Sequence, residues 1–179
     1  MSKRLKLWIL WFRQFRRLIR NDQLILTILA VIVGAASAYG TIIIRYTITY
    51  VQNALFDTSD VDLVQRVAAL PWWQILAVPT MGGLLVGFFV YYVIPGRKVQ
   101  GIASVIEASA LRGGRMSLRT GLGTALASAG SIGVGASVGR EGPAVHLGAT
   151  FGAWIAEKLH LTRSLSRALL GCGAAAAVA

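Results

Sequence analysis

Residues 23–44 read QLILTILAVIVGAASAYGTIII and contain no charged side chain. A second uncharged run covers residues 72–94, and a third covers residues 120–139. Each run is close to the roughly 20 residues that an α-helix needs to cross a hydrocarbon core about 30 Å thick. Three buried helices of a soluble protein are the alternative. With only 14% of the residues charged, too little polar surface would remain to cover them. We therefore predict an all-α membrane protein.

The first run is expected to continue as helix past Ile44, because residues 45–55 contain no helix breaker. Asn21 or Asp22 can cap its start. The small residues 36–38 resemble a signal-peptide cleavage site, but the basic segment before the run is long and apolar residues continue to Ile44. We therefore expect a retained, tilted span rather than a removed leader.

The formal net charge of +11 would suit a nucleic-acid partner, but the basic residues are arranged by loop. They gather before the first run, between the second and third runs, and after the next apolar segment, whereas the loop after the first run is acidic. Cytoplasmic loops of membrane proteins carry such an excess of Lys and Arg. We therefore expect no nucleic-acid partner, and an inner or plasma membrane protein with its N-terminus in the cytoplasm. Of the 18 basic residues, these three groups hold Lys3, Arg4, Lys6, Arg13, Arg16, Arg17 and Arg20, then Arg97, Lys98, Arg112, Arg115 and Arg119, then Lys158, Arg163 and Arg167; the loop after the first run holds Asp57, Asp60 and Asp62.

Residues 1–20 carry basic residues at helical spacing on one side and aromatic residues largely on the other. Such a helix lies in the membrane interface, with its aromatic side chains in the headgroup boundary and its cations toward anionic lipid. A solvated helix is the alternative. We expect two units, the interfacial helix of residues 1–20 and a transmembrane domain of residues 21–179. The pattern comprises Arg13, Arg16, Arg17 and Arg20 opposite Trp8, Trp11, Phe12, Phe15 and Ile19.

The remainder of the chain is rich in glycine, and its helices are expected to be short. Residues 101–111 and residues 142–156 each form a segment too short to cross a membrane untilted. Two glycine pairs have the four-residue spacing that lets membrane helices approach closely. Short helices broken by glycine are typical of transporters and channels. The pairs are Gly135 with Gly139 and Gly148 with Gly152.

The segment GREGP at residues 139–143 places two ionisable residues between apolar segments. Pro143 suits the first turn of a helix, where its missing N–H is no loss. The amides near Gly139 to Gly142 would then be unpaired donors at a helix N-terminus, which attracts anions. Glu141 is itself an anion beside that end, so its carboxylate can occupy the place of a mobile anion and vacate it when protonated. An Arg–Glu pair at a membrane boundary is the alternative.

Metal, redox and nucleotide chemistry receive little support. Cys172 is the only cysteine, and His146 and His160 are the only histidines. The sequence therefore predicts no intrachain disulfide and no metal site, and each histidine is expected to be buried or interfacial. Residues 133–139 loosely match a dinucleotide-binding fingerprint, but that motif needs a preceding strand, and an uncharged run of membrane length precedes it here. We expect no cofactor and no enzymatic activity.

Residues 137–148 read SVGREGPAVHLG and resemble the CLC family of chloride channels and chloride–proton exchangers. The small-residue stretch at residues 171–177 is similar to the one that follows the motif helix in that family. The resemblance implies that Glu141 is the gating glutamate. It also implies an outer anion site at Gly139, Arg140, Glu141 and Gly142.

The other anion motif of the family, commonly G-S-G-I-P, corresponds to VQGIA at residues 99–103. The resemblance makes Gln100, Gly101 and Ile102 further anion-binding candidates. Gln100 stands where many members have a chloride-binding serine, and Ala103 replaces the proline.

The resemblance also implies a fold of two inverted repeats, of which this chain corresponds to an unfinished first repeat of about six or seven helices. The expected function is transport of chloride or a similar small anion across a lipid bilayer, by channel or by proton-coupled exchange. The full-length form is expected to be a homodimer. A non-transporting membrane scaffold or an inactive transporter fragment is the rival interpretation.

Overall fold

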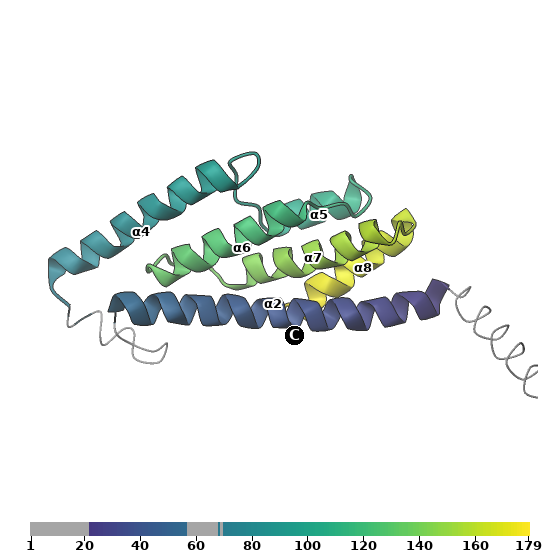
Figure 1. Ribbon diagram of the computed structural model, residues 1–179, viewed down its shortest axis with the longest axis horizontal. Coiled ribbons are helices and arrows are strands. Elements are labelled where there is room, and N and C mark those ends of the chain that lie inside the picture. The colour runs from purple at the N-terminus through teal and green to yellow at the C-terminus, as the bar shows by residue number, and fades with distance from the viewer. Residues whose placement is uncertain (1–21, 57–67, 69) are drawn as a thin grey trace, which may run out of the picture.

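The computed structural model describes residues 22–56, 68 and 70–179, and the helix expected for residues 1–20 lies outside them. Within the described ranges the chain forms six helices and no strand, which confirms the predicted all-α fold (Figure 1). The helices are α2 (Asp22–Phe56), α4 (Trp72–Val93), α5 (Ile102–Ala110), α6 (Leu118–Gly133), α7 (Glu141–Lys158) and α8 (Arg163–Ala176).

The long helix α2 confirms the extended first span. Its 35 residues correspond to about 52 Å at 1.5 Å per residue. Figure 1 shows α2 along the whole bundle, with α7 and α8 beside the half of α2 that is nearer its N-terminus. Helix α6 lies between α2 and α4. A helix of this length exceeds the thickness of a hydrocarbon core, so it must tilt or extend into the interface.

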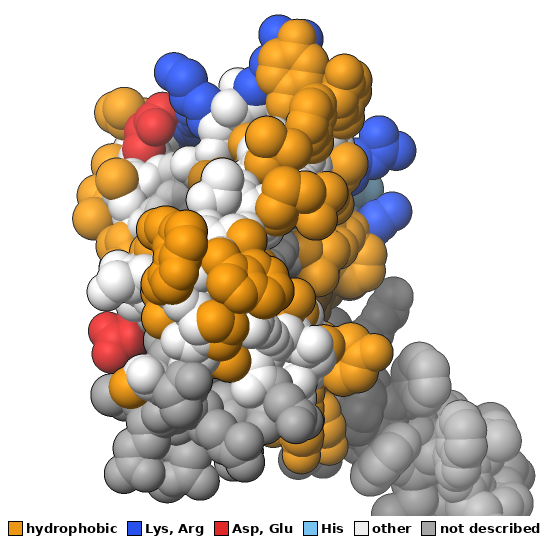
Figure 2. All heavy atoms as spheres, turned by 90° about the vertical axis from the view of Figure 1, so that its left-hand side faces the viewer, with side chains coloured by type: hydrophobic (Ala, Val, Ile, Leu, Met, Phe, Trp, Pro, Cys, Tyr) orange, Lys and Arg blue, Asp and Glu red, His pale blue; other side chains and the backbone are white. Residues whose placement is uncertain are grey.

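Helices α2 and α4 are each long and apolar enough to cross a membrane. Gly82 is the single buried residue of α4, and the large side chains of this helix, Trp72, Leu76 and Phe88 among them, are mostly exposed. Figure 2 shows hydrophobic side chains over much of the upper part of one face, where α4 lies, with basic side chains toward its margins. An exposed apolar face of this kind is what a lipid-facing helix presents.

The third uncharged run does not form a full-length span, so that prediction was wrong. Helix α6 has 16 residues, about 24 Å, and ends at Gly133 rather than near Gly139. Its end is a Schellman motif: Gly135 adopts φ +103°, its N–H donates to Ile132 O at 3.1 Å, and the Ala136 N–H donates to Ser131 O at 3.0 Å. The positive φ suits glycine, and the turn satisfies carbonyl groups at the helix end.

The packing of α7 against α8 brings the two backbones into direct contact. A Cβ added at Gly148 would meet the carbonyl group of Gly173, and one added at Gly152 would meet the carbonyl group of Leu169. On another side of α7, a Cβ at Gly121 of α6 would meet the side chain of Thr150. The four-residue spacing of Gly148 and Gly152 therefore does mark a close helix contact, as predicted.

The other glycine pair does not serve this purpose. Gly135 lies in the turn after α6, and Gly139 lies before α7 with nothing within 4 Å of the position that a Cβ would take. Four-residue spacing predicts a packing face only when both residues lie on one helix. The end of α6 at Gly133 places both outside any helix.

We expect Gly148→Ala to destabilise the protein because its Cβ would meet backbone atoms of Gly173, which cannot rotate away as a side chain can. The expected loss is about 1–3 kcal/mol, as for other overpacked cores. Thermal unfolding in detergent measures it. Gly87→Ala on α4, where a Cβ meets nothing within 4 Å, is the matched control and should not lower the melting temperature. Equal stability of the two variants would contradict this description of the α7–α8 contact.

Candidate functional site

The first predicted anion segment forms the start of α5. Gly101 is the N-cap residue, with extended backbone (φ −131°, ψ −157°), and Ile102 is the first helical residue. No side chain caps this end, and the first amides of a helix have no intrahelical partner. A Cβ at Gly101 would meet nothing within 4 Å. The backbone of the segment is therefore accessible to a ligand.

The GREGP segment forms the start of α7, as predicted. Arg140 is the N-cap residue and Glu141 is the first helical residue, with its side chain exposed. Gly142 follows, and Pro143 is buried in the first turn, where it has no N–H to satisfy. A Cβ at Gly139 or at Gly142 would meet nothing within 4 Å. The glycines thus leave the backbone uncovered on both sides of Glu141.

A histidine on the second turn of α7 connects the two segments. His146 lies five residues after Glu141, about 7.5 Å along the helix axis. Its Nε2 is 3.4 Å from Oε1 of Gln100, and the Gln100 N–H donates to Oγ1 of Thr124 on α6, also at 3.4 Å. Gln100, which precedes the N-cap residue of α5, therefore forms polar contacts with both α6 and α7. The sequence predicted a buried or interfacial His146, and its 1% exposure confirms the burial.

The contact between His146 and Gln100 was not predicted, and no spacing rule reveals it, because 46 residues separate the two. Thr124, which is fully buried, was missed for the same reason. Thr150 of α7 packs against the backbone of Gly121 of α6, and its hydroxyl donates to the carbonyl of His146 within α7 at 2.7 Å.

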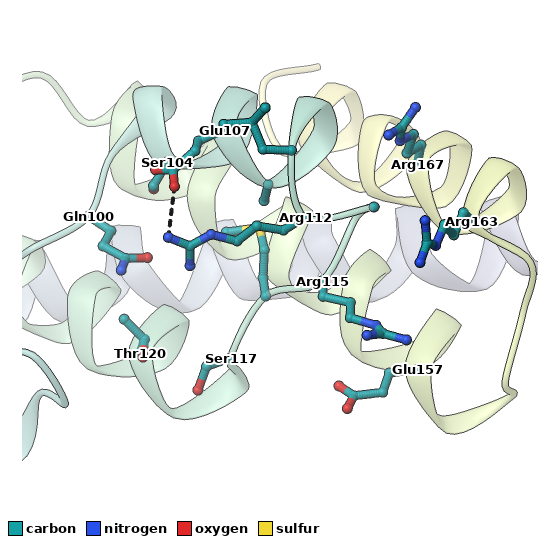
Figure 3. Close-up of a pocket in the computed structure, with 14 residues that line it drawn as sticks. Gln100, Ser104, Glu107, Arg112, Arg115, Ser117, Thr120, Glu157, Arg163 and Arg167 are labelled. Carbon is teal, nitrogen blue, oxygen red and sulfur yellow. Dashed lines mark hydrogen bonds and ion pairs between the residues drawn. The ribbon is translucent and has the colours of Figure 1, made fainter.

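A cavity of about 690 Å³ is lined by residues of α5, of the loop that follows it, and of α6, α7 and α8. Figure 3 shows Gln100 and Thr120 on one side of it and Arg163 and Arg167 on the opposite side. Glu141 is not among the lining residues. The structure thus joins Gln100 to a group of arginines, while the GREGP segment lies outside this cavity.

Four arginines and two glutamates line the cavity, which leaves a formal excess of two positive charges. Arg112 forms an exposed ion pair with Glu107 at 2.8 Å, and such surface pairs contribute little stability. Arg167 donates to the carbonyl of Ala110, the last residue of α5, at 3.2 Å. The sequence predicted these arginines only as markers of membrane orientation. Their convergence on one cavity arises from the fold.

Residues 82–179, more than half of the chain, match the sequence profile of the family described as voltage gated chloride channel. The matched region contains α5, α6, α7 and α8 together with both predicted anion segments. The chain belongs to the voltage gated chloride channel family. The resemblance proposed from the GREGP segment is confirmed at the level of the family.

Two relatives of this voltage gated chloride channel family member illustrate the similarity. The putative chloride channel protein ClcB-like of Ralstonia nicotianae is 38% identical over 154 residues, which cover 84% of this chain and 36% of the relative. The voltage-gated ClC-type chloride channel ClcB of Yersinia pseudotuberculosis is 27% identical over 154 residues, 85% of this chain and 37% of the relative. The chain thus spans little more than a third of the length of these relatives. No solved structure matches it.

The arginines should give the cavity a measurable preference for anionic reagents. In a Cys172→Ser background, which removes the only native cysteine, we expect Ser117→Cys to react several-fold faster with an anionic than with a cationic methanethiosulfonate. The rates are measured by labelling in membranes. Adding Arg163→Gln should reduce the ratio, whereas Lys158→Gln, a charge removed outside the cavity lining, should leave it nearly unchanged. Equal rates for the two reagents would contradict an electropositive cavity.

Proposed function

We propose that the protein transports chloride or a similar small anion across a lipid bilayer, by channel flow or by proton-coupled exchange, with Glu141 as the gate. The observation that carries the proposal is the joining of two uncapped helix N-termini, those of α5 and α7, through the contact between Gln100 and His146. Membership of the voltage gated chloride channel family supports the same conclusion. The names of the relatives describe chloride channels.

An anion that leaves water loses hydrogen bonds, and an uncapped helix N-terminus can replace them. Each presents amide N–H groups and about half a unit of positive charge. Around α7 the donors belong to Arg140, Glu141 and Gly142, and around α5 they belong to Gly101 and Ile102. The uncovered backbone at Gly139, Gly101 and Gly142 supports close approach of an ion. A scaffold that only packed helices would need no such uncovered segments.

Glu141 supplies the gate in this proposal because it is an exposed carboxylate in the first turn of α7. Its negative charge is attracted by the same helix end that attracts a mobile anion. The carboxylate and the anion therefore compete for one place. Protonation removes the charge of Glu141 and with it this competition, which links anion flux to protons.

The orientation of the protein across the membrane is inferred from the positions of its basic residues. Figure 1 shows α5, the end of α7 and the start of α8 at the end of the molecule where α2 begins. Of the arginines that line the cavity, Arg163 and Arg167 belong to the start of α8, and Arg112 and Arg115 lie in the loop after α5. Because basic residues remain in the cytoplasm, we assign the N-terminus of α2 and the mouth of the cavity to that side. The arginines would then concentrate anions at the cytoplasmic entrance.

The remaining parts of the proposal concern the whole protein. The described helices from α2 to α8 belong to its transmembrane domain. The exposed apolar faces of α2 and α4 support contact with lipid or with further helices of the subunit. The full-length subunits pair as a homodimer.

Glu141→Gln mimics the protonated carboxylate and should weaken the dependence of anion flux on pH. Flux is measured in proteoliposomes of the full-length protein between about pH 4 and pH 8, from acidic to mildly basic conditions. The variant should hold the flux near the level that the unmodified protein reaches at the acid end. Asp60→Asn, which removes a carboxylate outside both anion segments, should keep the original profile. A pH profile that Glu141→Gln leaves intact would rule out the gating role.

Gln100→Ser should change the relative permeation of chloride, nitrate and fluoride, because it replaces a long amide with a short hydroxyl that still donates a hydrogen bond. Reversal potentials or competitive efflux from liposomes give the permeation series. Gln74→Ser, a glutamine of α4 outside the cavity lining, is the matched control. Identical selectivity of the Gln100→Ser variant and the unmodified protein would place Gln100 outside the anion path.

A further inference from the structure

The contact between Gln100 and His146 contains a buried polar atom whose state decides what Gln100 can offer a ligand. His146 is almost completely buried, and its Nε2 lies 3.4 Å from Oε1 of Gln100. Its other ring nitrogen, Nδ1, is buried without a partner among the described residues. One nitrogen of the ring therefore carries the whole polar contact.

The unpaired Nδ1 selects between the two neutral forms of the imidazole. One ring nitrogen of a neutral imidazole donates and the other accepts. A buried N–H without an acceptor is rarer in proteins than an under-used acceptor lone pair. The proton therefore lies on Nε2, and the N–H of Nε2 donates to Oε1 of Gln100.

This direction of donation fixes the orientation of the Gln100 amide. The oxygen and the NH2 group of a glutamine have nearly the same shape, so packing alone does not distinguish them. With Oε1 facing His146, the NH2 group of Gln100 is the end that remains for a ligand in the cavity, which Gln100 helps to line (Figure 3). The backbone N–H is already engaged by Thr124, so the side chain supplies the donor.

We propose that His146 is a positioning residue for anion selectivity: by donating from Nε2 to Oε1, it makes Gln100 present two N–H donors, and not a carbonyl oxygen, to the anion. The inference rests on the proposed anion site at Gln100. A reversed amide would direct the negative end of its dipole at the ion and would lose the hydrogen bond to it. His146 acts through Gln100 and does not itself contact the anion.

The test uses His146→Phe, which keeps a ring in the buried position and removes the donor. Chloride binding to the full-length protein is measured by calorimetry in detergent, and the chloride-to-nitrate permeability ratio is measured in liposomes. We expect chloride binding to weaken about three- to tenfold, the range that corresponds to one net hydrogen bond. His146→Gln, whose NH2 group is a donor in the same place, should recover at least part of the affinity and of the original permeability ratio.

A double-mutant cycle separates positioning from a general structural role. In the Gln100→Ser background there is no amide to orient, so adding His146→Phe should change neither chloride affinity nor the permeability ratio further. An equal loss of binding with and without Gln100→Ser would overturn the inference. So would unchanged binding in His146→Phe when Gln100→Ser alone alters it, and in that case the proposed anion site would stand. If Gln100→Ser alone has no effect, the anion site at Gln100 fails and the inference fails with it.

Thermal unfolding in detergent accompanies each measurement, because His146 is buried between helices. If His146→Phe does not fold, His146→Leu removes the same donor with a smaller and more flexible side chain and enters the same cycle. The matched stability control is Thr150→Val, which changes a neighbouring buried residue whose hydroxyl donates to the carbonyl of His146 and leaves the imidazole in place. A comparable loss of chloride affinity in Thr150→Val and in the His146 variant, at equal loss of stability, would overturn the positioning role.

Discussion

The direct backbone contact between α7 and α8 is the constraint on which the rest of this structure depends. Glycines at positions 148 and 152 allow the carbonyl groups of α8 to lie against the helix surface of α7, where any side chain would keep the two apart. In a membrane the apolar side chains of a helix gain little by leaving lipid for protein, so close van der Waals packing carries much of the association energy. The closely packed pair of α7 and α8 is therefore the part of the bundle against which the other helices pack.

The packing of α7 determines where in the bundle its first turn lies. Because α7 is fastened along its length to α8 and to α2, its first turn lies beside the middle part of the bundle rather than at its end (Figure 1). The first amide groups of a helix have no partner within the helix itself. The uncovered glycines on both sides of Glu141 keep those groups accessible. Different glycines thus serve the two purposes: Gly148 and Gly152 allow the close packing, and Gly139 and Gly142 leave the site uncovered.

The junction at Gln100 shows the complementary use of polar side chains. Thr124 engages its backbone, and His146 engages its side chain, so that α5 is anchored at its start although the helix has only nine residues. A helix this short has little stability of its own. Buried polar contacts are directional, and they can hold one amide orientation where apolar packing would allow two. On the cavity side the arginines supply a long-range field, which needs no such fixed geometry.

The sequence by itself determined the membrane class, the ends of α2 and α4, and the start of α7 at the GREGP segment. These features depend on local chemistry: the absence of charge over a long run, proline in a first helical turn, and a residue pattern shared with a protein family. The length of α6 was predicted too long, because an uncharged run indicates a hydrophobic environment but does not reveal where a glycine with positive φ ends the helix. The tertiary structure alone decided that Gly148 and Gly152 contact α8, that four arginines converge on one cavity, and that His146 meets Gln100. These contacts join residues far apart in the chain, and their partners are set by how the helices pack, which no local pattern encodes.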